Sequence, residues 1–168
     1  FAEDARKAGI DTVEIQSGFP LRDFVLAKEA ARQFGPDIVH CHGAKANLVG
    51  VYLKMTLGCT VVTTVHSDYR LDYLHSFIRR QTFGRMNAAA LRVMDYHVTV
   101  SDSFKQMLIQ RGFRPSRIQT IYNGLDFSVD TPEFDRGEYL RQCGLNYQEG
   151  DVVMGIAARL TPVKDIPT

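Results

Sequence analysis

The feature that most constrains the fold is an alternation between short apolar, β-branched runs and longer segments with helical periodicity. Runs that are apolar at nearly every position are typical of parallel strands covered on both faces. The predicted strands are Thr12–Ile15, Asp37–His42, Thr60–Val65, Tyr96–Val100, Ile118–Tyr122 and Asp151–Ala157. This rhythm predicts an α/β fold with a doubly wound parallel sheet.

The segments between these runs carry signals that begin and end helices. Leu21–Phe34 is followed by Gly-Pro, a pair that ends helices. Ser101–Arg111 opens with Ser-Asp-Ser, and serine is well suited to cap a helix N-terminus. The other predicted helices are Ala44–Leu57, Ser76–Met94 with a weak point at Gly84, and a short one at Glu138–Cys143.

Composition narrows the class of protein. The 168 residues are 45% hydrophobic and 23% charged, which is typical of a globular domain, and the net charge of +1 argues against nucleic acid as a partner. Three cysteines without a CxxC motif fit a reducing compartment better than a disulfide framework. No apolar run approaches the roughly 18–20 residues that span a membrane. We therefore expect a cytoplasmic protein, with peripheral association at the inner face of the membrane as an alternative.

Two histidines and a cysteine stand in three consecutive positions, His40, Cys41 and His42. Side chains at i and i+2 of a strand share a face, so both histidines could reach one ion. A zinc site needs three or four ligands, however, and no second ligand pair is suitably spaced. Local hydrogen bonding at a strand end is one alternative, and ligand contact is another. Because ligands of open α/β sheets bind beyond the carboxyl ends of the strands, His42, Gly43 and Lys45 are candidate ligand contacts, and no metal site is predicted.

Further candidates follow the later strands. His66 comes directly after the run Thr60–Val65, where a histidine suits substrate contact or proton handling, and packing or capping is the alternative. His97 lies inside a predicted strand and is expected to be structural. Ser101 follows a strand end, where a helix N-cap and a hydroxyl contact with a ligand fit equally well.

Two basic residues, Arg159 and Lys164, stand in the loop after the last apolar run. An arginine can bind a diphosphate bidentately, and a lysine can hold it as a point charge. From spacing alone this signal is weak, because two exposed basic side chains are usually just solvated. The sequence contains no GxGxxG, GxxxxGK[ST] or GxSxG motif, which argues against dinucleotide, P-loop and serine-hydrolase sites.

Five stretches of the chain form an ordered set. They are Pro36–His42, Thr63–His66, Val98–Ser101, Ile121–Asp126 and Arg159–Lys164. This set resembles the family 4 glycosyltransferases, which are retaining enzymes of the GT-B fold, from about Ala5 to Lys164. The resemblance implies two Rossmann-like domains that face each other across a cleft, one for the acceptor and one for the donor. Residues 1–145 would be the acceptor-side domain, with a connector from about 123, and residues 146–168 would begin the donor-side domain.

The resemblance also implies roles for individual residues. His66 would be the catalytic residue near the transferred sugar. Arg159 and Lys164 would hold the donor diphosphate and stabilise its charge as the sugar leaves. The acceptor cleft would be lined by His42, Gly43, Lys45, Ser101 and Asn123.

By the same resemblance, the full-length parent would transfer a sugar, with retention, from a nucleotide-diphosphate donor to a cell-envelope glycan or lipid-linked acceptor, without a metal or other cofactor. The family's first strand, its glycine-rich loop and its acidic E-x7-E motif are not found in the sequence. We therefore expect the chain alone to be inactive, and to dimerise or swap strands through an exposed sheet position. The alternatives are a UDP-N-acetylglucosamine 2-epimerase-like isomerase, a non-catalytic GT-B-like binding domain and, least favoured, a zinc protein.

Overall fold

The computed structural model describes residues 2–70, 80–124, 128, 133, 135–146, 148 and 150–158. The chain divides into two compact units, Phe1–Asn123 and Gly124–Thr168, and each is described by itself. No helix in the described part of the chain is long and apolar enough to cross a membrane. The domain boundary near residue 145 stays a prediction.

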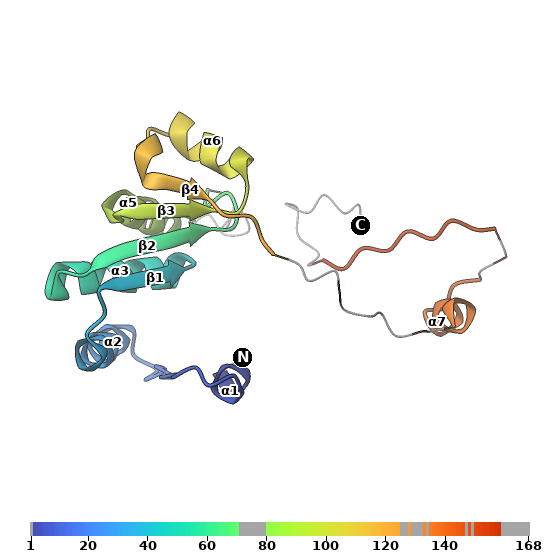
Figure 1. Cartoon of the computed structure of the whole chain (residues 1–168), viewed down its shortest axis with the longest axis horizontal. Coiled ribbons are helices and arrows are strands. Elements are labelled where there is room, and N and C mark those ends of the chain that lie inside the picture. The colour runs from blue at the N-terminus through green and yellow to red at the C-terminus, as the bar shows by residue number, and fades with distance from the viewer. Residues whose placement is uncertain are drawn as a thin grey trace. The chain divides into compact units, whose positions relative to one another are not determined.

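The first unit is built on a sheet of four parallel strands (Figure 1). The strands are β1 (Ile38–His42), β2 (Thr60–Val65), β3 (Tyr96–Thr99) and β4 (Ile118–Thr120), and they lie in the order β1-β2-β3-β4. All three neighbouring pairs are parallel. The predicted α/β class with a Rossmann-like parallel sheet is confirmed, because β1, β2 and β3 are each joined to the next strand by a helical crossover.

Helices precede the first strand and connect the others. They are α1 (Ala2–Lys7), α2 (Pro20–Phe34), α3 (Ala44–Leu57), α5 (Arg85–Val93) and α6 (Asp102–Gln110), with a π-helical turn at Arg80–Gly84 and a 3-10 turn at Pro115–Arg117. Gly35 and Gly58 end α2 and α3 with φ of 66° and 75°, a left-handed conformation that glycine adopts without strain. The predicted helix Ser76–Met94 is described from residue 80, and at Gly84 the π turn gives way to α5.

Two predicted strands are not formed. Thr12–Ile15 is irregular, and Val13 is 72% exposed. An ion pair between Arg6 and Glu14 links this segment to α1. Asp151–Ala157 is also irregular, with Met154 92% exposed. Both runs have the composition of a strand, but a strand needs a partner for its backbone groups, and neither run pairs with a described segment.

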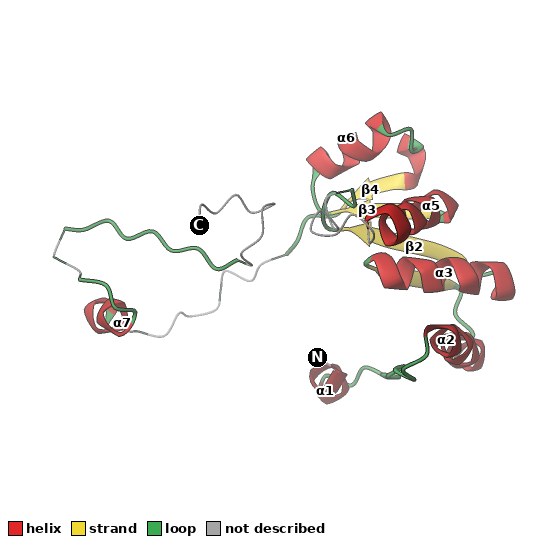
Figure 2. Cartoon of the chain, turned by 180° about the vertical axis from the view of Figure 1, so that it is seen from behind, coloured by secondary structure: helices red, strands yellow, loops and turns green. Residues whose placement is uncertain are grey.

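One face of the sheet carries the core. Val61, Val65 and Ile118 are buried on it, in clusters with Leu91 and Leu108 of the covering helices. The two views of the chain show α3 and α5 together on this side of the sheet (Figure 2). A chain of polar side chains is buried here as well: Thr63 Oγ1 donates to Asn47 Oδ1 at 2.6 Å, and Asn47 Nδ2 donates to Asn87 Oδ1 at 2.9 Å. This network ties β2 to both helices.

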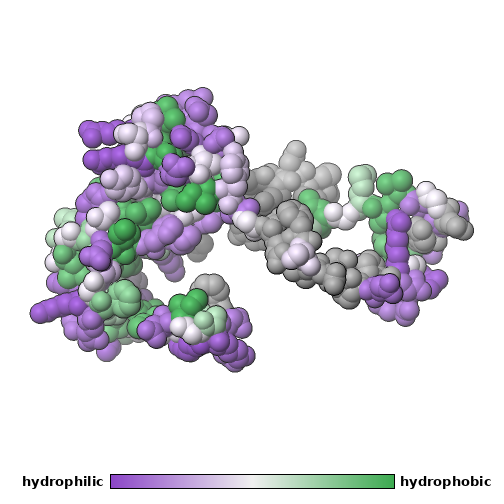
Figure 3. Space-filling view, in the orientation of Figure 1, coloured by the Kyte–Doolittle hydropathy of each residue, from purple (hydrophilic) through white to green (hydrophobic). Residues whose placement is uncertain are grey.

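The other face of the sheet is open in the described part of the chain. Ile38 and Tyr96 remain 61% and 51% exposed on it, and Val62 and Val98 are only half-buried. The face appears in Figure 3 as a mixture of apolar and weakly hydrophilic surface. Among the described residues, the helices pack on the core face of the sheet or at its edges.

The second unit has one described helix, α7 (Arg136–Gln142). Asp135 caps its N-terminus, since its Oδ1 accepts from the backbone N–H of Glu138 at 3.0 Å. The predicted short helix at Glu138–Cys143 is thus present and begins earlier, because the cap lies three residues before Glu138.

Candidate functional site at the carboxyl ends of β1 and β2

The two histidines predicted to contact a ligand lie side by side. His42 is the last residue of β1, and His66 directly follows β2. The parallel register pairs His42 with Thr64, which brings His66 up beside the end of β1. His42 Nδ1 and His66 Nε2 lie 3.0 Å apart, within hydrogen-bond distance, and both side chains are exposed.

His40 extends this pair into a row of three rings. The centroids of His40 and His42 are 4.6 Å apart, and those of His42 and His66 are 5.3 Å apart. His40 Nε2 is bonded to Thr64 Oγ1 at 2.8 Å, so this nitrogen is committed to the sheet. The rings are stacked and do not converge on one point. Among the described residues, no group of three or more His, Cys, Asp or Glu side chains could hold a metal ion.

The electrostatics of the row favour a neutral His42 ring. Partial burial lowers the pKa of His42 below its ordinary value, and the adjacent His40 and His66 lower it further, because a charged His42 would repel a second charged ring. When both rings are neutral, the proton between them belongs either to His42 Nδ1 or to His66 Nε2. In both cases, the remaining nitrogens, Nδ1 of His66 and Nε2 of His42, are one donor and one acceptor.

Gly43 and Lys45 continue this edge. Gly43 has φ of 86°, and it precedes α3 without a side-chain cap, so the first turn of α3 is left without a side-chain acceptor. Lys45 is exposed and lies within electrostatic reach of Asp23 on α2. The pKa of Asp23 is lowered first by its hydrogen bonds with Ser17 and further by the charge of Lys45.

Ser101 and Asn123 follow β3 and β4 at the same edge of the sheet. Ser101 Oγ accepts from the backbone N–H of Phe104 at 3.3 Å, so the serine caps α6. Near it, Tyr122 donates from its hydroxyl to Asp102 at 2.7 Å. Asn123 is exposed and is the last residue of the first unit. All five predicted acceptor-side residues thus lie at the carboxyl ends of strands, although Ser101 already has a structural partner.

The sequence analysis missed an ion pair that anchors the loop after His66. Arg111 donates to both carboxylate oxygens of Asp68, at 2.7 and 2.6 Å, and its guanidinium lies 4.9 Å from the ring centre of Tyr69. The two side chains are only 17% and 22% exposed. The bonds from Arg111 hold the pKa of Asp68 below its usual range. Because the partners are forty-three positions apart in sequence, no local pattern could have revealed the pair.

The donor-side residues cannot be placed beside this site. Arg159 and Lys164 lie outside the described residues, as does Asp126 of the ordered set. Their assignment to the donor diphosphate stays a prediction.

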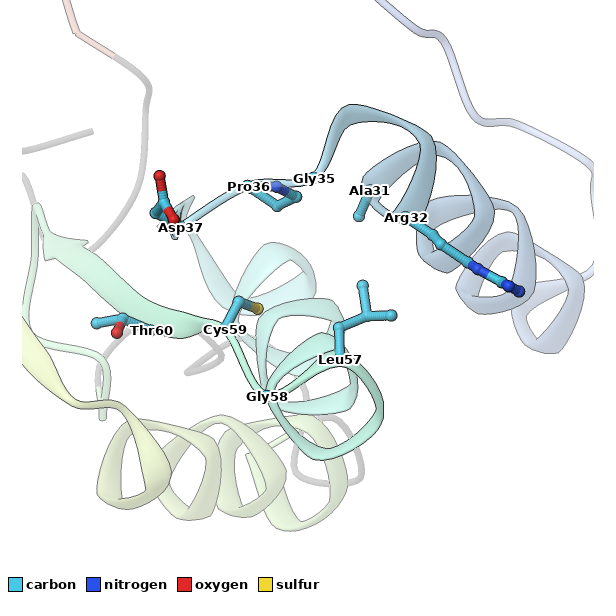
Figure 4. Close-up of a pocket in the computed structure, with 9 residues that line it drawn as sticks. All are labelled: Ala31, Arg32, Gly35, Pro36, Asp37, Leu57, Gly58, Cys59 and Thr60. Carbon is cyan, nitrogen blue, oxygen red and sulfur yellow. The ribbon is translucent and has the colours of Figure 1, made fainter.

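A cavity of about 350 Å³ lies at the opposite ends of β1 and β2, between the C-terminal ends of α2 and α3 (Figure 4). Gly35 and Gly58, the two helix-ending glycines, line it, together with Cys59 and Asp37. Figure 4 shows Arg32 pointing away from Asp37 and Thr60. The charged groups around this cavity therefore do not converge, and the histidine row remains the better candidate site.

Comparison with known proteins identifies the family. The sequence profile of Glycosyltransferase Family 4 matches residues 13–129, which is most of the chain and includes the histidine row. The chain belongs to glycosyltransferase family 4. No curated protein sequence matches it.

Two solved structures share the fold of this family 4 chain. Anabaena HepE, crystallised in complex with UDP, is 22% identical with a TM-score of 0.54, and the match covers 73% of this chain and 32% of that one. The UDP-GlcNAc 2-epimerase from Methanocaldococcus jannaschii is 16% identical with a TM-score of 0.51, and the match covers 70% of this chain and 34% of that one. The chain thus spans about a third of the length of either structure.

Proposed function

We propose that this chain forms the acceptor-side part of a retaining glycosyltransferase that uses a nucleotide-diphosphate sugar. The observation that carries the proposal is the hydrogen-bonded pair His42–His66 at the carboxyl end of a parallel sheet, in a member of glycosyltransferase family 4. In open α/β folds this edge is where ligands bind. The complex of Anabaena HepE with UDP is consistent with a nucleotide-sugar donor.

The chemistry of the pair suits a sugar. A neutral pair offers one donor and one acceptor outward, and sugar hydroxyls both accept and donate. We propose that His66 contacts the transferred sugar and that His42 holds His66 in one orientation. On the same edge, Gly43, Lys45, Ser101 and Asn123 would line the acceptor cleft, and the acceptor would be a cell-envelope glycan or a lipid-linked glycan.

The donor diphosphate would be held by Arg159 and Lys164. Two cations aimed at a leaving diphosphate stabilise the charge that develops in the transition state, so the reaction would need no metal ion. On this proposal, residues 124–168 supply only part of a donor site, and the 168-residue chain alone is inactive. The protein would work in the cytoplasm, with peripheral association at the inner face of the membrane as an alternative.

The test uses the full-length protein that carries this chain, screened for nucleotide-sugar hydrolysis and for thermal shifts by nucleotide sugars. Arg159→Ala and Lys164→Ala should each weaken donor binding by about tenfold or more, because each removes a charge-assisted contact. The matched control is Arg141→Ala, an exposed arginine of α7 in the same unit. Full donor affinity in both variants would rule out the diphosphate assignment.

His66→Gln tests the role of His66, and the reaction products separate the transferase from its alternatives. The variant should lower the transfer rate strongly while the nucleotide-induced thermal shift remains. The similarity to a UDP-GlcNAc 2-epimerase makes an epimerase-like isomerase the second candidate. Solvent deuterium appearing at C2 of the sugar, without transfer to any acceptor, would favour the isomerase, and nucleotide-sugar binding without any turnover would favour a binding domain.

A further inference from the structure

A basic cavity lies at the end of the sheet opposite to the histidine row. Its volume is about 260 Å³, and it is formed where β3 and β4 begin. Arg92 from the last turn of α5, Arg114 just before the 3-10 turn and Arg117 at its end line the cavity together with His97 and Phe113. None of the residues that line the cavity is acidic.

The wall of the cavity is held in place before any ligand arrives. Arg92 donates to the carbonyl oxygen of Gly112 at 3.0 Å and to that of Arg111, and its guanidinium lies 4.1 Å from the ring centre of Phe113. Carbonyl partners fix the orientation of a guanidinium but leave its charge uncompensated. The side chain has therefore already lost most of its conformational freedom, which lowers the entropic cost of binding an anion.

His97 forms the buried part of this wall. It is only 4% exposed, its Nε2 is bonded to the carbonyl of Leu91 at 2.8 Å, and its ring meets Phe113 edge-on with centroids 5.0 Å apart. The Nδ1 atom is buried beside the Arg117 backbone and makes no hydrogen bond of ordinary geometry. This wall of the cavity is thus buried and held by contacts within the fold.

The other two arginines supply charge that is not used in the fold. Arg114 and Arg117 are exposed, and neither forms an ion pair among the described residues of the chain. The charge of Arg117 helps to lower the pKa of Asp95, but that carboxylate is already paired with Lys54 at 2.5 Å. Three arginines line one cavity that has no carboxylate in its lining, and a positively charged lining of guanidinium groups suits a phosphate group.

We propose that this cavity is an anion site that binds a phosphate or diphosphate group. The site is separate from the histidine row, because the two lie at opposite ends of the same parallel strands, and it does not depend on the proposed transferase activity. The phosphate group could belong to a small soluble ligand or to the headgroup of an anionic lipid. Both sources share the chemistry that the arginines recognise.

The test measures binding to the complete 168-residue chain by calorimetry, with inorganic phosphate and pyrophosphate as probes. A parallel arm measures co-sedimentation with vesicles of phosphatidylcholine, with and without phosphatidylglycerol. The double variant Arg114→Gln/Arg117→Gln should weaken binding of the effective probe by about tenfold or more, since two charge-assisted contacts are lost. Neither side chain is buried, so the fold should survive, which circular dichroism verifies.

The matched control is Arg22→Gln/Arg32→Gln, which removes two exposed arginines from α2 and leaves the same net charge as the double variant. It should bind like the original chain. Binding of pyrophosphate in solution would assign the site to a soluble ligand, and binding only to phosphatidylglycerol vesicles would assign it to a lipid headgroup. Absence of binding to all probes, or equal losses in the two double variants, would overturn the proposal.

Discussion

The two faces of the sheet differ in what completes them. On one face, α3 and α5 bury both apolar side chains and a chain of three polar ones, Thr63, Asn47 and Asn87. On the other, Ile38 and Tyr96 stay more than half exposed within the described structure, although the strands carry β-branched residues on that side as well. The comparison shows that strand composition predicts which segments form a sheet. The packing of the helices determines which face of that sheet is buried. Five substitutions test this difference, from the largest expected effect to the smallest.

Gly50→Val should have the largest effect, because it adds a side chain on the covered face, where α3 packs directly against β1 and β2. A Cβ added at Gly50 would lie 2.5 Å from Cys41 Sγ and 2.9 Å from Val61 Cγ1, so β1, β2 or α3 must shift. We expect the free energy of unfolding to fall by about 3 kcal/mol, at the upper end of overpacking costs. Denaturant unfolding measures it. Met55→Val, on the exposed side of the same helix, is the control, and equal losses in both variants would mean that the contact is not tight.

Asn47→Ala should come next, since it breaks the buried polar chain on the same face. Without this amide, the hydroxyl of Thr63 and the amide oxygen of Asn87 both lose their hydrogen-bond partner. We expect a loss of about 2 kcal/mol from buried groups left unsatisfied. The double variant Asn47→Ala/Thr63→Val should recover part of that loss in the same unfolding experiment, because it removes one of the orphaned groups. A double variant less stable than the single one would contradict this explanation.

Asp68→Asn should have a smaller effect, because the ion pair with Arg111 is partly open to solvent. We expect a loss of about 1 kcal/mol at neutral pH. The pKa of Asp68 is lowered in the folded chain, so its contribution is present above the unfolded pKa of about 4 and is lost as pH falls through the folded value. Unfolding curves of the original chain and the variant should therefore converge in acid. A difference that stays constant down to the acid limit would show that the carboxylate charge is not responsible.

Tyr96→Lys and Ile38→Lys should change stability least, because both side chains lie on the open face. We expect losses of less than about 0.5 kcal/mol, as for other surface sites. β1 is the edge strand of the described sheet, so the chain could associate with itself through this edge or the open face. In that case the lysines should reduce association by charge repulsion. Analytical ultracentrifugation of the chain and its variants measures this. A monomeric original chain would end the dimerisation hypothesis, and large losses of stability would show that the face is covered.

The sequence allowed a good prediction of strand location and of the candidate edge. Four predicted strands, their parallel direction, the glycines that end α2 and α3, and the serine that caps α6 were all readable from short-range patterns. The carboxyl-end position of His42 and His66 followed from the same rule. Thr12–Ile15 and Asp151–Ala157 failed because composition measures the tendency to form a strand, while a strand exists only where another supplies its hydrogen bonds.

Local patterns in the chain decide where helices and strands begin and end, since caps, turns and apolar periodicity act over a few residues. The pairing of His42 with His66, the Asp68–Arg111 ion pair and the cavity lined by Arg92 and Arg117 are different in kind. Each joins residues from separate elements, so it depends on the register of the strands and on which face the helices cover. Those are properties of packing between distant segments, and they become visible only in the tertiary structure.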